Sequence, residues 1–255
     1  MAASHESGSA DNPQQAAKPK EAFTSTRWSM VIRAADASDT RSQKDLEEIC
    51  RACWHPIYGF VRRQGYSPED AQDLAQGFFE HVLRNNVLSH ADPERGRFRS
   101  FLLGALRHFV SNEARKYRAE KRGGGFSFVP LEGEDSEERF ERSLAHPDTP
   151  EKHFERSWAE SLLARAMEAL RKDYERVNKL KLFEQLQPFL IGSANPNSYE
   201  ELGKSIGMSS GTVAVAVFRM RKRYGELLRQ EIAQTVEDPA DVEHEIRLLL
   251  QAVAG

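Results

Sequence analysis

The spacing of apolar residues is the feature of this sequence that most restricts its fold. After residue 26, apolar side chains recur at intervals of three or four residues almost without interruption, and no segment shows a convincing strand-like alternation. Intervals of three or four residues place side chains on one face of an α-helix, whereas a strand needs every second residue to be apolar. We therefore predict an all-α protein.

Three helices are predicted in the first half of the chain. The first contains Pro56, which predicts a kink. The second begins at Ser67-Pro68, since serine caps a helix and proline suits the first helical position. The third follows a turn near residue 92 and runs from about residue 97 to 118. The apolar stripe of the first helix consists of Leu46, Ile49, Cys50, Cys53, Ile57, Phe60 and Val61.

Charge is distributed unevenly along the chain, although the total is close to zero. The sequence holds 36 Lys and Arg against 39 Asp and Glu, a net charge of -3. That total argues against a protein that coats nucleic acid by charge alone, because such proteins carry a large basic excess. Residues 95–122, however, contain nine Lys or Arg and two Glu, a local charge of +7. This segment is either a concealed DNA-binding surface or an ordinary solvated helix face.

Glycine, proline and clustered charge divide the chain into five parts. Residues 1–25 are typical of a disordered leader, and residues 26–122 form a first helical module. Residues 123–150 read as an acidic linker, with six acids and one Arg between 132 and 141. Residues 151–232 form a second helical module. Residues 233–255 add an amphipathic helix that packs on the second module or binds a regulator, and the sequence leaves both open.

The sequence argues against a membrane protein, a disulfide-stabilised protein and an enzyme. No apolar run approaches the roughly 20 residues of a membrane-spanning helix, and no signal peptide is recognised. The two cysteines, Cys50 and Cys53, suit a reducing cytoplasm and are predicted core residues rather than zinc ligands. No nucleophile, base and orienting residue occur in a credible arrangement. We expect no catalytic residue, metal or cofactor, and a cytoplasmic location.

Residues 198–213 of the second module have the spacing of a helix-turn-helix. A short helix begins at a capping Ser198, carries Gly203 where a neighbouring helix must approach, and turns at Gly207. The second helix restarts at Ser209 or Ser210. Two packed helices with a glycine turn also occur in ordinary bundles, but the polar start and the basic tail of the second helix favour DNA binding.

The second helix of this motif has two predicted faces. The inward stripe consists of Val213, Val217, Met220 and Tyr224. The outward stripe consists of Gly211, Val215, Phe218 and Lys222. A recognition helix of this kind inserts its outward stripe and its N-terminal residues into the major groove of DNA.

With both modules in view, the chain resembles bacterial RNA polymerase sigma factors of the compact extracytoplasmic-function type. Residues 70–79 are similar to that family's Asp-Leu-x-Gln-Glu-x-Phe motif, and residues 98–108 to its Phe-Arg-x-Trp-Leu…Ala-Arg-Asn motif. Residues 115–122 are similar to the basic tail that follows. The resemblance covers about residues 42–122, a region 2-like helical bundle, and 155–230, a region 4-like helix-turn-helix.

The resemblance implies a sigma factor that binds core RNA polymerase and directs promoter recognition and DNA melting. The polymerase-binding residues would be Asp70, Asp73, Gln76 and Phe79. The residues for the minus-ten strand would be Arg95, Arg97, Arg99, Phe101, Arg107, His108, Arg115, Lys116 and Arg118. The residues for the minus-thirty-five duplex would be Ser209, Ser210, Gly211, Thr212, Val215, Arg219, Lys222 and Arg223. The implied partners are core polymerase and promoter DNA, and the sequence leaves open whether an anti-sigma factor or other regulator binds.

The chain departs from the family pattern at several positions. Gly77 stands where the family usually has Glu, and Ala214 and Ala216 occupy positions that often carry Lys and Arg. The upstream readout therefore leans on the polar start of the helix and Arg219, or is weak. The alternative function is an autonomous helix-turn-helix regulator whose first module is a dimerisation or sensor domain. A hydrolase or phosphotransferase on a helical scaffold is a remote third class.

Overall fold

A computed structural model describes residues 42–90, 97–119, 136–190, 196–236 and 238–254. Every regular element in these ranges is helical, which confirms the predicted all-α class. The predicted leader, residues 1–25, lies outside the described residues. In chain order the α-helices are α2 (Ser42–Arg63), α3 (Pro68–Arg84), α4 (Phe98–Ala119), α5 (Ser136–Ser143), α6 (Pro150–Arg176), α7 (Leu180–Leu186), α8 (Pro196–Ile206), α9 (Ser210–Ala233) and α10 (Val242–Ala254). The short 3-10 helices are η1 (Val87–His90), η3 (Gln187–Phe189) and η4 (Pro239–Asp241).

Capping side chains and prolines fix where α3 and α6 begin. The Oγ atom of Ser67 accepts a hydrogen bond from the backbone N–H of Asp70 at 3.1 Å, and Pro68 is the first residue of α3, as predicted. The Oγ1 atom of Thr149 likewise accepts from the N–H of Lys152 at 3.2 Å, ahead of the proline that opens α6. Each cap satisfies a backbone donor that the first helical turn leaves unpaired.

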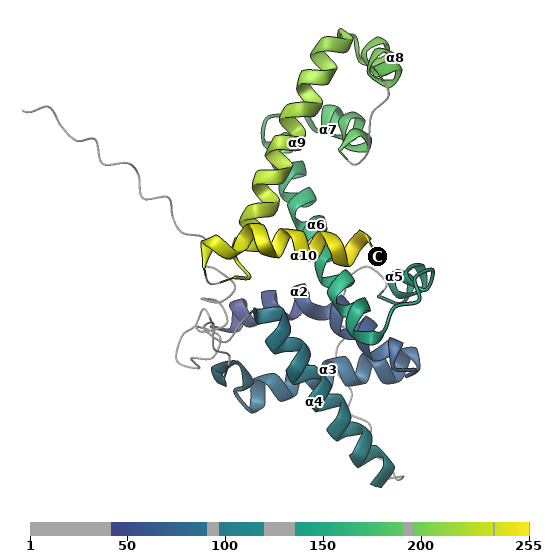
Figure 1. Cartoon of the computed structure of the whole chain (residues 1–255), viewed down its shortest axis with the longest axis vertical. Helices are drawn as coiled ribbons and strands as arrows, with labels where there is room; N and C mark the ends of the chain where they lie inside the picture. Colours follow the sequence, from purple (N-terminus) through teal and green to yellow (C-terminus); the bar gives the residue numbers. More distant parts are fainter. Residues whose placement is uncertain (1–41, 91–96, 120–135, 191–195, 237, 255) are drawn as a thin grey trace, which may run out of the picture.

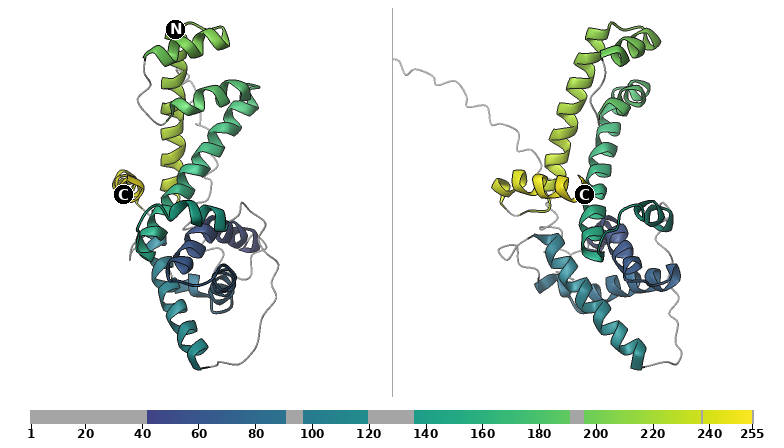
Figure 2. Two further views of the ribbon diagram at one scale, coloured as in Figure 1. Left: turned by 90° about the vertical axis from the view of Figure 1, so that its right-hand side faces the viewer. Right: turned by 45° about the vertical axis from the view of Figure 1, so that its right-hand side comes forward.

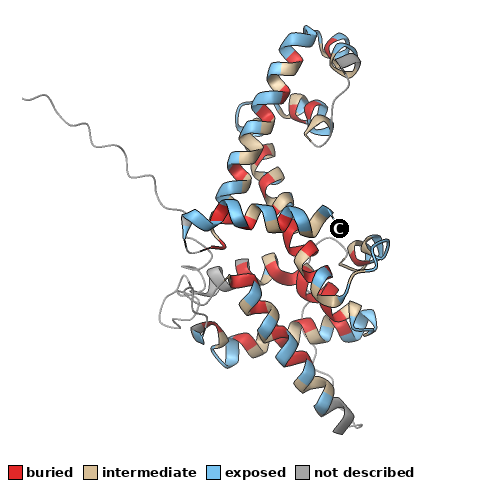
Figure 3. Ribbon diagram, in the orientation of Figure 1, coloured by how far each residue is buried: buried red, intermediate tan, exposed pale blue. Residues whose placement is uncertain are grey.

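The helices enclose two hydrophobic cores at opposite ends of an elongated molecule (Figures 1 and 3). The two longest helices, α6 and α9, contribute to both cores and run side by side in opposite directions (Figure 2). The first core lies among α2, α3, α4 and the first half of α6, and its largest fully buried residues include Phe60, Phe78, Phe98 and Trp158. The second core lies among the second half of α6, α7, α8 and α9, and includes Leu170, Leu186, Val213, Val217 and Met220.

The boundary between the two cores differs from the boundary predicted between the two modules. The helix α6 begins where the second module was predicted, but its first half packs in the first core through Phe154, Trp158 and Leu162. A close approach of α2 and α6 explains this packing. A Cβ atom on Gly59 would lie 2.1 Å from Nε2 of His153, so only glycine lets the two helices come this close.

Part of the predicted linker is a helix that packs on α2. In α5, Glu137 forms an ion pair with Arg62 at 2.6 Å, and the hydroxyl of Tyr58 donates to the same carboxylate. The hydrogen bond from Arg62 lowers the pKa of Glu137, while burial and the Glu137 carboxylate raise the pKa of Tyr58. The indole N–H of Trp54 donates to Ser136 at 2.9 Å. The described end of the acidic segment is therefore attached to the first core.

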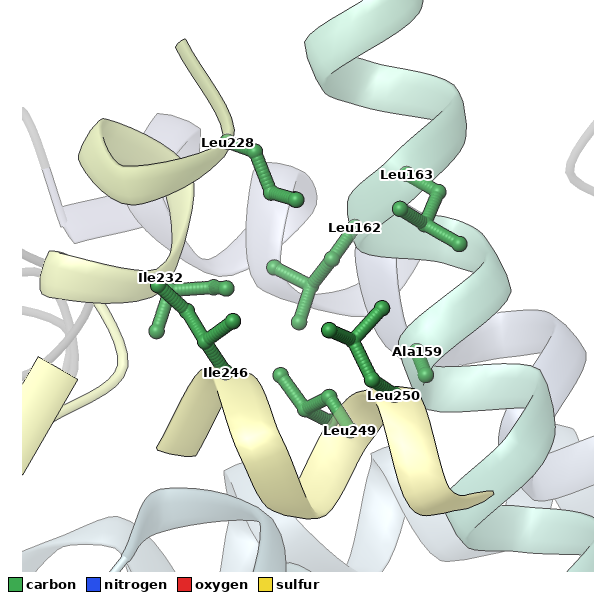
Figure 4. A pocket seen from close by; sticks show the side chains of 8 residues that line it. All are labelled: Ala159, Leu162, Leu163, Leu228, Ile232, Ile246, Leu249 and Leu250. Atoms are coloured by element: carbon green, nitrogen blue, oxygen red, sulfur yellow. The ribbon is translucent and has the colours of Figure 1, made fainter. Parts of the chain in front are cut away.

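The C-terminal helix α10 packs across α6 and α9. Figure 4 shows apolar side chains from the three helices converging, among them Leu162 from α6, Ile232 from α9, and Ile246 and Leu249 from α10. The gap left between them is about 10 Å³, no more than one water molecule occupies. The junction is thus a packing contact rather than a ligand pocket. Among the described helices, none has the length and apolar character that crossing a membrane requires.

Candidate nucleic-acid interface

Helices α8 and α9 meet at a tight turn that the sequence fixes. A Cβ atom on Gly203 would lie 2.5 Å from the carbonyl oxygen of Met208, so the chain passes too close for any side chain there. Gly207 adopts a positive φ of 70°, which glycine tolerates best. The hydroxyl of Ser209 then caps α9 by accepting from the N–H of Thr212 at 3.1 Å. The turn at Gly207 and the restart of the second helix at Ser210, both predicted from the sequence, are confirmed.

The two faces of α9 are separated as the sequence predicts. Val213, Val217 and Met220 are at most 1% exposed and pack in the second core. On the opposite side Val215 is 50% exposed and Phe218 is 68% exposed. The N-terminal residues of α9 and its cap are also exposed, at the distal end of the molecule (Figure 3). These residues are Ser209, Ser210, Gly211 and Thr212.

The basic residues that follow on α9 are not equivalent. Arg219 and Lys222 are exposed on the outward side. Arg223 instead forms an ion pair with Asp173 of α6 at 2.7 Å, and the hydrogen bond that its guanidinium donates to this carboxylate raises the pKa of Arg223. Arg221 donates two hydrogen bonds to the backbone carbonyl of Phe189, at 3.0 and 2.6 Å. The structure thus places Arg219 and Lys222 toward solvent and holds Arg223 against the second core.

Carboxylates of the same chain cover the start of the basic helix α4. Arg97 and Arg99 lie 2.8 and 3.1 Å from the carboxylate of Glu245, which comes from α10 and is only 1% exposed. Arg99 also lies 3.0 Å from Glu155 of α6. Burial raises the pKa of Glu155, since it disfavours the charged carboxylate. In this conformation Arg99 has no free surface on which a nucleic-acid strand could bind.

The remaining residues predicted for the minus-ten strand are distributed along α4. Arg107, His108 and Arg115 are exposed, and the ε nitrogen of Arg107 lies 3.7 Å from Glu151. Phe101 packs partly against the first core. Lys116 and Arg118 lie in α4, but their side chains are outside the description, and Arg95 lies outside the described residues altogether.

The predicted polymerase-binding residues lie on α3. Asp70 and Asp73 are exposed and Gln76 is half-buried. The Asp70 carboxylate accepts a hydrogen bond from the Ser67 hydroxyl at 2.9 Å. Phe79 is buried, and its ring stacks on that of Trp54 with the ring centroids 5.9 Å apart. The two acids and Gln76 therefore form a polar surface, and Phe79 packs in the first core.

Sequence reasoning assigned no role to Glu245 and Glu155, the acids that face Arg99. For Glu245 a signal was present in the sequence. It lies three residues after Val242 and four before Leu249, so it falls on the apolar stripe of its helix. A single acid on an apolar stripe is seldom buried without a cationic partner. That position predicts a buried ion pair, although it does not identify the arginine.

Two cysteines and one histidine are core side chains. No cluster of three or more His, Cys, Asp or Glu able to hold a metal ion occurs in the described ranges. Cys53 is buried and Cys50 half-buried on α2, both in the first core, as predicted. Burial, reinforced by the nearby charge of Arg63, lowers the pKa of His153 to about 4, so this histidine is a neutral core residue at physiological pH.

Comparisons of this chain with protein-family models, with curated proteins and with solved structures find no match. A functional assignment therefore depends on the two basic helices and on the sequence motifs. The exposed face of α9 can enter a DNA groove through its apolar and polar residues while Arg219 and Lys222 contact phosphates. The exposed part of α4 can hold a phosphate backbone, and its first turn is covered by Glu245.

Proposed function

We propose that this protein is a sigma-type initiation factor that binds core RNA polymerase and directs promoter recognition and DNA opening. In this assignment the polar surface of α3 binds the polymerase, α4 holds the minus-ten strand, and α9 reads the minus-thirty-five duplex. The observation that carries the proposal is the exposed stripe of α9, capped by Ser209 and followed by outward-facing cations. The two motifs at residues 70–79 and 98–108, which follow in the order of the sigma family, extend the proposal from DNA binding to initiation.

The physical demands of DNA opening agree with this division of roles. Separating two strands costs roughly 1.4 kcal/mol for each stacked step. A protein that opens DNA therefore needs a second surface that holds the released strand, in addition to the one that recognises the duplex. The basic helix α4 packs in the first core, whereas the N-terminal half of α9 packs in the second. A protein that only reads duplex DNA has no need of such a helix.

A reconstitution experiment tests the proposal. Purified protein, core RNA polymerase and promoter fragments are combined, and strand opening is followed by permanganate reactivity together with run-off transcription. Strand opening that requires the protein is the expected result. Reversal of charge in Asp73→Lys is expected to abolish polymerase binding, because Asp73 is exposed on α3. The matched control is Glu184→Lys, which makes the same charge change at an exposed position of α7. This helix packs in the second core, away from α3.

The alternative is an autonomous helix-turn-helix regulator, and one observation favours it. The reading face of α9 is open, whereas Arg99 at the start of α4 is already paired with acids of the same chain. A regulator would bind duplex DNA by itself and would need no open basic surface on α4. The absence of a complex with polymerase at low salt, together with a tight footprint of the protein alone on duplex DNA, would replace the sigma assignment with this one.

A further inference from the structure

Helix α9 exposes two apolar side chains that no other described part of the protein covers. Phe218 is the most exposed of the large apolar residues in the described ranges, and Val215 lies one turn before it on the same face. Water around an apolar ring does not stabilise the folded state, and exposed apolar groups on a polar surface often mark a binding site. The position of this pair within the helix-turn-helix indicates what it binds.

The surroundings of the pair are positively charged. No Asp or Glu occurs between Glu201 and Glu226, and this interval holds five Lys or Arg. Two of these cations, Arg219 and Lys222, are exposed next to Phe218 along α9. A ligand for this surface must therefore offer negative charge at its edges and an apolar group at its centre. The DNA major groove offers both, because phosphates line it and the 5-methyl group of thymine projects into it.

The pair also lies close enough to the N-terminus of α9 to contact bases. Val215 and Phe218 are the sixth and ninth residues of α9, which begins at Ser210. At a rise of about 1.5 Å per residue both lie within roughly 14 Å of its start. In a helix-turn-helix this N-terminal part of the second helix contacts base edges, while more distant residues contact the backbone.

We propose that Val215 and Phe218 recognise thymine through its 5-methyl group, so that the duplex bound by α9 carries thymine at the positions facing them. The inference rests on the proposed function and names the base that this surface selects. Of the four bases, only thymine presents a methyl group in the major groove. Apolar side chains can therefore select thymine without a hydrogen bond, while the hydroxyls of Ser210 and Thr212 contact neighbouring bases.

The experiment removes single methyl groups from the DNA. A pool of duplexes with a randomised segment is selected on the full-length protein, alone and bound to core RNA polymerase. The selected duplex is then synthesised with deoxyuridine replacing thymine at one position at a time, which removes the methyl group and keeps the base pair. We expect one or two positions at which this replacement weakens binding about fourfold, the effect of burying one methyl-sized group.

Phe218→Ala tests whether this side chain recognises the methyl group, and Arg219→Ala is its control. In Phe218→Ala the sensitive position is expected to become insensitive to deoxyuridine, because the side chain that contacts the methyl group is gone. The exposed location of Phe218 means that the variant should keep the unfolding midpoint of the parent protein in urea. In Arg219→Ala binding is expected to weaken on every duplex while the response to deoxyuridine stays, since a phosphate contact carries no base preference.

The outcomes separate this inference from the proposed function. Selected duplexes that tolerate deoxyuridine at every position would overturn thymine recognition and leave DNA binding intact. The same response to deoxyuridine in the parent, Phe218→Ala and Val215→Ala proteins would overturn thymine recognition as well. A loss of polymerase binding in Phe218→Ala or Val215→Ala, without any change in duplex binding, would also overturn it. Failure to enrich any duplex, with or without polymerase, would overturn the proposed function and this inference with it.

Discussion

The two basic helices of this protein, α4 and α9, differ in how much of their charge is available. At the start of α4, Arg97 and Arg99 face Glu245, and the second arginine is almost fully buried. On α9, Arg219 and Lys222 are exposed, and neither forms an ion pair within the described ranges. Cationic composition alone therefore does not define a nucleic-acid surface. The decisive property is whether acids of the same chain already occupy it.

The covered surface has a clear physical basis. Arg97 and Arg99 lie at the start of α4, where the helix dipole already contributes positive charge. A carboxylate placed there offsets both arginines and the dipole, and α10 supplies one by packing its apolar face on α6 and α9. A nucleic-acid phosphate would have to displace Glu245 to reach Arg99. The free protein should accordingly bind duplex DNA through α9 more readily than single strands through α4.

Replacing Glu245 by Gln is the change expected to have the largest effect. The variant keeps the size of the side chain but removes its charge, and losing one partner of a buried ion pair costs about 3–5 kcal/mol. Arg97 then loses its acidic partner and Arg99 keeps only Glu155, so the start of α4 attracts phosphates more strongly. We expect the free energy of unfolding in urea to fall by that amount. Affinity for a labelled single strand, measured by fluorescence anisotropy, should rise by about tenfold, or about 1.4 kcal/mol.

Glu243→Gln is the matched control for this change. Glu243 pairs with Arg229 at 2.8 Å, but both side chains are more than half exposed, so the pair contributes under about 1 kcal/mol. We expect single-strand affinity to stay unchanged. If Glu243→Gln raised single-strand affinity as much as Glu245→Gln, the loss of any negative charge from α10 would explain the increase. The lower accessibility of the cations of α4 would then not depend on Glu245.

Mild acid is expected to weaken the first core and spare the second. Burial lowers the pKa of His153 to about 4, from about 6.5 in the unfolded chain, so the folded state favours the neutral ring. This preference contributes fully above pH 6.5 and is lost as the pH falls from 6.5 toward 4, a total of about 3 kcal/mol. The second core contains no histidine, because none occurs between residues 154 and 243. Urea unfolding at pH 7.5 and 5.0 measures the loss.

His153→Gln isolates this contribution from those of other groups. Glu155 and Glu160, whose pKa values are raised by burial, oppose the histidine, but they are present in both proteins and cancel in the difference. The variant is expected to lose about 2 kcal/mol less than the parent between pH 6.5 and 5. Equal losses in the two proteins would show that His153 is not the group that responds to acid.

Within α9 the exposed and the paired arginine should differ in their response to salt. Arg219→Ala is expected to reduce the slope of log affinity for duplex DNA against log salt by about 1, because one phosphate contact is lost. Arg223→Ala should leave the slope unchanged and lower the stability by under about 1 kcal/mol, since Arg223 pairs with Asp173. Titrations at several salt concentrations distinguish the two. A reduced slope in both variants would mean that Arg223 leaves Asp173 when DNA binds.

The parts of the fold that the sequence predicted depend on neighbours within one or two helical turns. The Ser67 and Ser209 caps, the turn at Gly207 and the inward and outward faces of α9 all follow from short-range spacing. Periodicity also predicted the apolar stripe of α6 but could not show that its two halves pack in different cores. A continuous stripe carries no information about which helix covers each part of it.

The candidate site was predictable to the same extent. Spacing identified the exposed face of α9, but it could not distinguish Arg223, which pairs with Asp173, from the exposed Arg219. The same limit applied to α4, because Arg99 and Glu245 are 146 residues apart and only tertiary packing brings them together. Phe79 was predicted as a surface contact from its motif, but its ring packs on Trp54. The motif alone does not distinguish residues that form a surface from residues that pack beneath it.

The smallest expected effect distinguishes two arginines on the same helix. Arg107 is exposed in α4 and lies 3.7 Å from Glu151, whose side chain is less exposed, and a solvated ion pair at this separation contributes little to stability. Arg107→Ala should therefore lower the salt slope for single-strand binding by about 0.7, the value of one phosphate contact, whether or not Glu245 is present. Arg99→Ala should do so only in the Glu245→Gln background, because in the parent protein Arg99 is buried against acids. An equal effect of Arg99→Ala in both backgrounds would mean that α10 does not restrict access to α4.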